Sequence, residues 1–252
     1  MRYFIELSYK GRNYHGWQIQ PNDVSVQQTI EKALSVLLGK EIAVVGCGRT
    51  DAGVHARQFY LHFDSYRELD KEKLKYRMNA LLPEDIAIFQ VINVKDEAHA
   101  RFDACSRTYE YHISLTKDVF YNELSMRLIG PSLDLEKMNH AAGLLLNYSD
   151  FKCFSRSNSD VKNYDCQVSK ARWNKKDDRL IFVISANRFL RNMVRAIVGT
   201  LLQVGLGKMS IEEFKRVLES RDRTKAGASV KAHGLFLTSV KYPQKVFIDQ
   251  HV

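Results

Sequence analysis

The feature that most constrains the fold is an order of strand and helix patterns that occurs twice along the chain. In the first half, alternating or apolar strand patterns occupy 2–9, 42–45, 58–63 and 86–94. Helical patterns occupy 25–39 and 70–81, and the second half repeats the order with strands at 107–115, 168–173, 180–186 and 234–242 and helices at 134–146 and 189–204. Each half therefore reads β-α-β-β-α-β, which is the split βαβ arrangement.

This repeat predicts an α+β fold of two pseudo-symmetric, ferredoxin-like halves that form a continuous mixed sheet with a central cleft. We expect the N-terminal α+β domain to span 1–104 and the C-terminal α+β domain to span 105–252, because no long linker separates the halves. A further short helix at 211–220 precedes the last strand.

Capping residues mark the helices of this pattern. Ser25 with Gln28 three residues later is typical of a helix N-terminus, and Gly39 is typical of its end. Asp70 and Asp134 are predicted N-caps of two further helices.

The charge balance favours an acidic partner. The chain has 38 Lys and Arg against 29 Asp and Glu in 252 residues, a net charge of +9, and nucleic acid is the commonest partner of such a chain. A basic but otherwise ordinary enzyme is the alternative. No apolar run approaches the roughly 20 residues that span a bilayer. The four cysteines are widely spaced, which predicts neither disulfides nor a zinc site and fits the cytoplasm.

The most unusual local sequence is the glycine-rich segment 46–56, GCGRTDAGVHA, between two predicted strands. It holds one carboxylate, Asp51, two residues after Arg49. A loop carboxylate beside an arginine could be a nucleophile, a general base or a group that orients a ligand. It could equally form an Asx-type turn with an ion pair in solvent, and the loop alone leaves these alternatives open.

Six blocks follow one another along the chain: YKGRNYHGWQIQ at 9–20, GRTDAGVHA at 48–56, NALLPEDI at 79–86, HARF at 99–102 with RTYEY at 107–111, NRFLRNMVRAIVG at 187–199, and KAHGLFL at 231–237. In this order they resemble the motifs of the TruA-type tRNA pseudouridine synthases, and they cover nearly the whole chain.

The resemblance implies a homodimer that needs neither a metal nor an organic cofactor. It also implies tRNA as partner and isomerisation of uridine to pseudouridine on the 3′ side of the anticodon stem-loop. In that reaction the N-glycosidic bond breaks, the uracil turns within the pocket, and a carbon–carbon bond forms at C5.

Three catalytic residues follow from the matching motif positions. Asp51 would act as nucleophile or base, by attack at C1′ or by a glycal route, and Arg195 would pair with it and keep it ionised. Tyr109 would stack on the extruded uracil and relay the C5 proton. The alternatives are a solvated helix arginine and a core tyrosine, which is how we expect Tyr111 to behave.

The substrate-binding residues expected beside Tyr109 are arginines. Arg49 would hold the phosphate of the flipped nucleotide or fill its vacated place in the stem. The other positive charges expected on an RNA surface are Arg57, Arg101 and Arg107, with Lys10, Arg12, Lys152, Arg156, Arg188 and Arg191. The histidines at 55, 62, 99 and 112 do not fall at metal-ligand spacing.

Two segments depart from the family pattern: NYDCQV at 163–168, where a basic run is common, and GASV at 227–230, where prolines are common. Two other functions stay open at this point. One is a catalytically silent RNA-binding protein, against which the intact GRTDAGVHA segment argues, and the other is a synthase that acts on another RNA.

Overall fold

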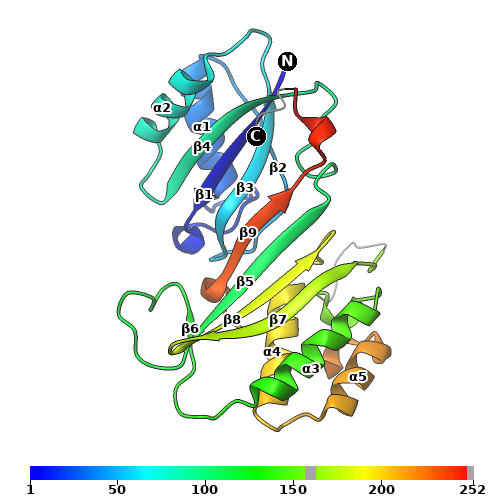
Figure 1. Cartoon of the computed structure of the whole chain (residues 1–252). Helices are drawn as coiled ribbons and strands as arrows, with labels where there is room; N and C mark the ends of the chain where they lie inside the picture. The colour runs from blue at the N-terminus through cyan, green and yellow to red at the C-terminus, as the bar shows by residue number, and fades with distance from the viewer. Residues whose placement is uncertain (157–162, 249–252) are drawn as a thin grey trace. The chain divides into compact units, whose positions relative to one another are not determined.

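The computed structural model describes residues 1–156 and 163–248, and it divides into two compact units (Figure 1). Unit 1 comprises Met1–Ser106 and the chain from Leu237 onward, and unit 2 comprises Arg107–Phe236. The division of the chain at 104 and 105 that the sequence predicts lies next to the first of these boundaries. It differs at the second, because the C-terminal segment groups with the first unit.

Unit 1 is built from strands and two helices in the predicted order. Its elements are β1 (Arg2–Tyr9), α1 (Val26–Leu38), β2 (Val45–Gly46), β3 (His55–Asp64), α2 (Lys71–Leu81) and β4 (Ile86–Val94). The last strand, β9 (Leu235–Lys241), belongs mostly to this unit, and the strand order is β4-β1-β3-β9 with β2 also paired to β3.

Unit 2 repeats the pattern with longer connections. Its elements are β5 (Ser106–Ser114), β6 (Met126–Arg127), α3 (Leu135–Leu144), β7 (Val168–Lys176), β8 (Arg179–Ala186), α4 (Met193–Gly205) and α5 (Ile211–Ser220). The strand order is β5-β8-β7, and the short β6 lies parallel to β5.

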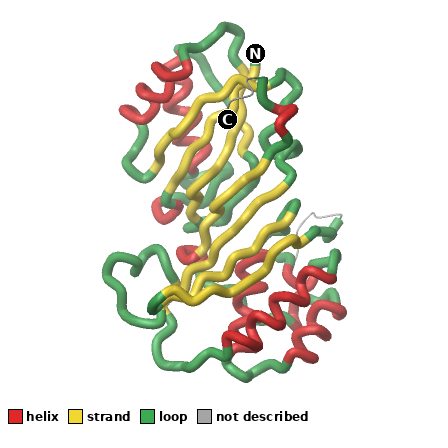
Figure 2. Tube along the Cα trace, viewed as in Figure 1, coloured by secondary structure: helices red, strands yellow, loops and turns green. Residues whose placement is uncertain are grey.

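Strand pairing shows the duplication directly. With the short β6 left aside, the first strand of each unit pairs antiparallel with the third, and the third pairs antiparallel with the second: β1–β3–β2 and β5–β8–β7. The α+β class with a mixed sheet is therefore confirmed. In each unit the helices gather on one side of the strands (Figure 2). The predicted central cleft stays a prediction.

The caps that the sequence predicts are present. The side chains of Ser25, Asp70 and Asp134 accept hydrogen bonds from backbone N–H groups in the first turns of α1, α2 and α3. Gly39 ends α1 with φ of 71°, a left-handed conformation that glycine adopts without strain.

The strand expected at 42–45 is wrong except at its last residue. Ile42 N–H donates to the Ser35 hydroxyl at 2.9 Å, and Val44 N–H donates to Glu31 Oε1 at 2.9 Å. The Val44 carbonyl accepts from Gln27 Nε2 at 3.1 Å. Side chains of α1 thus satisfy backbone groups that a strand ladder would otherwise pair.

The helix expected from residue 189 begins four residues later, at Met193. Asn192, its N-cap, has φ of 66°, which a right-handed helix does not accommodate. Met193 N–H instead donates to the Leu190 carbonyl at 3.1 Å, so the preceding residues form a turn.

Candidate functional site

The loop that carries Asp51 connects β2 to β3 in unit 1. Asp51 is half-buried and Arg49 is exposed. The Asp51 carbonyl accepts a hydrogen bond from Val54 N–H at 3.1 Å, which closes a turn at the end of the loop. Gly53, inside this turn, has φ of 76°. The segment therefore contains a backbone turn. The Asx-type turn, which would use the Asp51 side chain, and the catalytic role of this carboxylate both stay predictions.

A second segment, the one after β1, braces the loop on both sides of Asp51. Trp17 N–H donates to the Thr50 carbonyl at 3.2 Å, and Gly53 N–H donates to the Tyr14 carbonyl at 3.3 Å. The Tyr9 hydroxyl lies 2.9 Å from the Thr50 hydroxyl. The backbone is thus held at Thr50, directly before Asp51, and at Gly53, two residues after it, which would suit a reacting group that must keep its position.

Two glycines of the bracing segment allow this approach. A Cβ atom on Gly11 would lie 1.9 Å from the Val54 carbonyl oxygen, and one on Gly16 would lie 2.5 Å from the Thr50 carbonyl oxygen. Gly16 also has φ of +91°. The atoms that these Cβ atoms would meet belong to the backbone, which cannot move aside as a flexible side chain could. Only glycine therefore fits at these two positions without a backbone shift.

His55 takes a structural position at the end of the loop. Its Nδ1 accepts a hydrogen bond from Gly11 N–H at 3.0 Å, and the residue is 1% exposed. Because Nδ1 accepts, a neutral ring carries its proton on Nε2. Across the described residues, no group of three or more His, Cys, Asp or Glu side chains has an arrangement that could hold a metal ion.

Asp85 anchors the bracing segment to the start of β4. Its carboxylate accepts from the Tyr14 hydroxyl at 2.6 Å and from Asn13 Nδ2 at 3.0 Å. Its carbonyl accepts from Lys10 N–H at 2.9 Å. Burial, with the Asp85 hydrogen bond second, raises the pKa of Tyr14 well above its usual value. The sequence places Asp85 in the NALLPEDI block, two residues after Pro83, but no local pattern assigns it this role.

The HARF segment forms a second cluster in unit 1. His62 Nδ1 accepts from Ala100 N–H at 3.0 Å, and the rings of His62 and His99 lie 4.7 Å apart. The His99 ring packs on Phe102 at 4.2 Å between centroids, and the Arg101 guanidinium lies 5.6 Å from the Phe102 ring. Burial, with the charges of Arg2 and His99, lowers the pKa of His62 to about 4. The exposed Arg101 thus lies beside a row of packed rings formed by Phe102, His99 and His62.

The other predicted residues lie in unit 2. Tyr109, on β5, is half-buried, and its ring packs edge-on against Phe189 at 5.1 Å and 86°. Arg195, on α4, is also half-buried, and its Nε donates to the Val230 carbonyl at 2.8 Å.

Further contacts define these side chains more closely. The charge of Arg195 lowers the pKa of Tyr111, although burial has the larger and opposite effect and raises it overall. The Tyr111 hydroxyl donates to the Lys231 carbonyl at 2.8 Å, and the residue is fully buried, as expected of a core tyrosine. Arg107, at the start of β5, donates from Nη1 to the Asn187 carbonyl at 2.8 Å.

The predicted residues thus fall into two groups. Arg49, Asp51, Arg57 and Arg101 belong to unit 1, with Arg57 exposed on β3, whereas Arg107, Tyr109 and Arg195 belong to unit 2. The pairing of Asp51 with Arg195 joins residues of different units, and it stays a prediction.

Comparison with known proteins shows the family of the chain. The chain matches the tRNA pseudouridine synthase family over residues 7–103 and 141–243. It is 51% identical over 247 residues to tRNA pseudouridine synthase A of Parabacteroides distasonis, with 98% of each chain covered. It is 40% identical over 250 residues to tRNA pseudouridine synthase A of Francisella tularensis subsp. novicida, which covers 98% of this chain and 96% of the relative.

The fold, the braced loop and these matches define an RNA-modifying isomerase. The chain belongs to the tRNA pseudouridine synthase family.

Proposed function

We propose that the protein converts uridine to pseudouridine on the 3′ side of the tRNA anticodon stem-loop, with Asp51 as the catalytic carboxylate. The reaction class follows from family membership, since the family consists of pseudouridine synthases. The observation that carries the role of Asp51 is the bracing of its loop, in which hydrogen bonds hold Thr50 and Gly53 to the segment after β1.

The reaction is balanced without a co-reactant. The bond between N1 of uracil and C1′ of the ribose breaks, the uracil turns, and a bond forms between C5 and C1′. The proton that leaves C5 is offset by one gained at N1, so nothing is oxidised or reduced. Asp51 acts as the nucleophile at C1′ or as the base of a glycal route, and both need the ionised carboxylate.

Two side chains of unit 2 would complete the site. Arg195 would pair with Asp51 and favour its ionised form, because an arginine stays charged at any working pH. Its hydrogen bond to the Val230 carbonyl restricts the orientation of the guanidinium. Tyr109 would stack on the flipped uracil and relay the C5 proton, and its packing on Phe189 limits the motion of its ring.

Arginines would hold the flipped RNA. Arg49 is exposed two residues before Asp51, where it would contact the phosphate of the flipped nucleotide or fill its place in the stem. Arg57, Arg101 and Arg107 would contact the backbone of the stem. The net charge of +9 is consistent with this, since phosphate contacts dominate affinity for nucleic acid.

We also propose a homodimer that acts in the cytoplasm, as the sequence resemblance implies. Within residues 1–156 and 163–248, every helix is too short or too polar to cross a bilayer. Sedimentation equilibrium of the purified protein would test the dimer, and a mass equal to one chain would contradict it.

The decisive experiment compares Asp51→Ala with Glu97→Gln, an exposed carboxylate of the same unit. Unmodified tRNA is incubated with each protein, and pseudouridine is detected chemically. Asp51→Ala should lower the rate by at least about 10³-fold, because removing a nucleophile or base removes the chemical step. Its affinity for tRNA should stay close to that of the wild type, and Glu97→Gln should match the wild type in both measurements.

Three other outcomes would contradict part of this proposal. Product formation by Asp51→Ala would contradict the role of Asp51. Binding of tRNA without product by the wild type would favour a catalytically silent RNA-binding protein. Product on another RNA only would favour a synthase with that substrate.

A further inference from the structure

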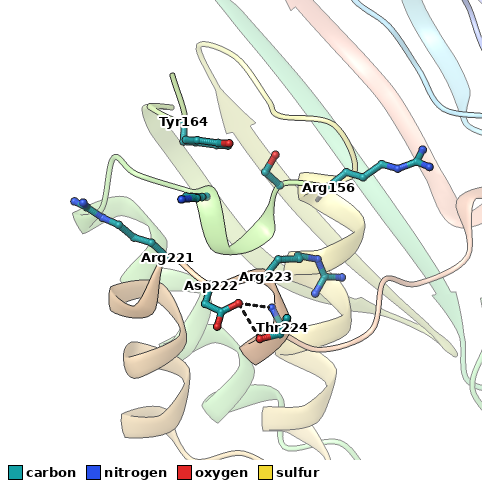
Figure 3. Close-up of a pocket in the computed structure, with 8 residues that line it drawn as sticks. Arg156, Tyr164, Arg221, Asp222, Arg223 and Thr224 are labelled. Atoms are coloured by element: carbon teal, nitrogen blue, oxygen red, sulfur yellow. Dashed lines mark hydrogen bonds between the residues drawn. The ribbon is translucent and has the colours of Figure 1, made fainter. Parts of the chain in front are cut away.

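A groove in unit 2 combines positive charge with an unpartnered buried hydroxyl (Figure 3). Its volume is about 420 Å³. We call it the basic groove. Its lining residues include Lys152, Ser155, Arg156, Tyr164, Arg221 and Arg223. Its lining residues between α3 and β7 fall at 152–156 and at 164, and the others fall at 221–224, directly after α5.

Backbone hydrogen bonds hold one wall of the groove in shape. A 3-10 turn over Lys152–Phe154 ends with a hydrogen bond from Ser155 N–H to the Lys152 carbonyl at 3.0 Å. Arg156 N–H donates to the Arg191 carbonyl at 3.1 Å, and Phe151 N–H donates to the Tyr164 carbonyl at 3.1 Å. The groove is therefore built into the fold.

The nearby carboxylates already have partners. Asp222 Oδ1 accepts from both Thr224 N–H and the Thr224 hydroxyl, at 2.9 and 2.8 Å (dashed in Figure 3). Asp150 pairs with Arg221 Nε at 3.0 Å and accepts from Lys152 N–H at 2.9 Å. Four cations against these two carboxylates leave the groove positive, which suits an anionic ligand.

Ser155 supplies the second observation. The residue lines the groove and is 3% exposed, yet its hydroxyl has no hydrogen-bond partner among the described residues. A buried hydroxyl without a partner costs free energy, and such a group in a native fold calls for a ligand or a solvent molecule that completes it.

The arrangement of the cations selects an extended ligand. In Figure 3, the side chains of Arg156 and Arg221 extend in opposite directions, so their charges do not converge on one point. A single phosphate would need converging donors, whereas a chain of phosphates would meet both. Lys152 Nζ lies 5.6 Å from the centre of the Tyr164 ring, whose face offers a stacking surface for a base or ribose.

We propose that the basic groove binds the phosphodiester backbone of tRNA, with the Ser155 hydroxyl donating to a phosphate oxygen and Lys152 and Arg156 neutralising adjacent phosphates. This inference rests on tRNA being the substrate. It adds a binding site in unit 2 that involves none of the residues assigned to the chemical step.

Binding of an unmodified tRNA transcript at several salt concentrations tests the groove. The double variant Lys152→Gln/Arg156→Gln is compared with Lys208→Gln/Arg216→Gln, an exposed pair in the same unit that does not line the groove. Loss of two phosphate contacts should raise Kd about tenfold or more and reduce the slope of log Kd against log salt by about 2. The control pair should keep the wild-type Kd and slope.

Ser155→Ala provides a readout that a structural role would not give. Because the hydroxyl has no partner in the free protein, the variant should keep or raise the Tm while the Kd for tRNA rises several-fold. An unchanged Kd would overturn the role of Ser155, and a double variant that binds like its control would overturn the groove. Neither of these two results would contradict the proposed function if the wild type still forms pseudouridine. Failure of the wild type to bind tRNA would overturn both the groove and the proposed function.

Discussion

The two units differ most at the connection between their second and third strands. In unit 1, the residues between β2 and β3 form the loop that carries Asp51, and a distant segment holds it in place. In unit 2, the same position of the pattern holds only Asp177 and Asp178, a tight turn between β7 and β8. The same order of strands therefore carries the long Asp51 loop in unit 1 and a two-residue hairpin turn in unit 2.

The long loop between β2 and β3 is held by a second segment of the chain, whereas the two-residue turn between β7 and β8 is not in need of one. The hairpin of unit 2 takes its shape from the ladder on either side, and Asp177 with φ of 52° completes the turn. The loop of unit 1 takes its shape from Tyr14, Gly16 and Trp17. Unit 2 instead extends the connection between α3 and β7, which forms part of the basic groove.

Among variants outside the proposed catalytic residues, the largest effect on activity should come from Gly11→Ala, which separates the unit 1 loop from its brace. The new Cβ would meet the Val54 carbonyl at 1.9 Å, so the backbone must shift. We expect a loss of about 2–3 kcal/mol in the free energy of unfolding. The value of kcat/KM on tRNA should fall on the order of 10²-fold, because Asp51 moves with the loop.

Gly48→Ala is the matched control in the same loop. Among the described residues, a Cβ there would have no heavy atom within 4 Å, apart from its chain neighbours. Urea unfolding should give a stability within about 0.5 kcal/mol of the wild type. Equal stability losses in the two variants would contradict the bracing of this loop.

Lowering the pH should destabilise unit 1 through His62, a buried histidine of that unit. Its pKa of about 4 in the fold lies below the unfolded value of 6.5, so the unfolded state binds more protons between these values. The stabilisation is full above about pH 6.5 and is lost as the pH falls to about 4, at a cost of about 2–4 kcal/mol.

Urea unfolding at pH 7.5 and pH 4.5 would measure this loss. His62→Asn, which keeps an acceptor for Ala100 N–H, should reduce the difference between the two values, whereas His140→Asn, an exposed histidine of unit 2, should not. A pH dependence unaffected by His62→Asn would contradict the assignment.

A smaller effect is expected for Asp85→Ala, which removes the anchor of the brace. The Tyr14 hydroxyl and Asn13 would lose their acceptor, at a cost of about 1–3 kcal/mol. Thermal unfolding would measure it against Glu84→Ala, an exposed neighbour that should change the stability by less than about 0.5 kcal/mol. A similar Tm for both variants would show that Asp85 does not anchor the segment.

The smallest effect should occur in the unit 2 hairpin. Asp177→Gly relieves a left-handed φ and should add at most about 0.5 kcal/mol of stability. Asp178→Gly, where φ is not positive, should instead cost about 0.5–1 kcal/mol because glycine loses more entropy on folding. Calorimetry on both would check the pair, and a loss of stability in Asp177→Gly would show that its turn is not strained.

Much of the fold could be predicted because its signals are local. The caps at Ser25, Asp70 and Asp134 and the apolar run at 86–94 depend on neighbouring residues, and they marked elements close to their observed bounds. Two expectations failed for different reasons. At 42–45, side chains of α1 satisfy the backbone, and at Asn192 a positive φ delays the start of α4 to Met193. Neither appears in a residue pattern.

For the candidate site, the order and spacing of residues were enough to predict the family and the duplicated pattern. They also single out Asp51, whose catalytic role stays a prediction. The contacts of the folded chain explain why positions 11 and 16 are glycine. They also show that Asp85 and His62 support the segments around Asp51 and Arg101. Those roles arise from contacts between residues tens of positions apart, such as Gly11 against Val54 and Tyr14 with Asp85. Contacts of that range follow from the packing of strands, which no local pattern encodes.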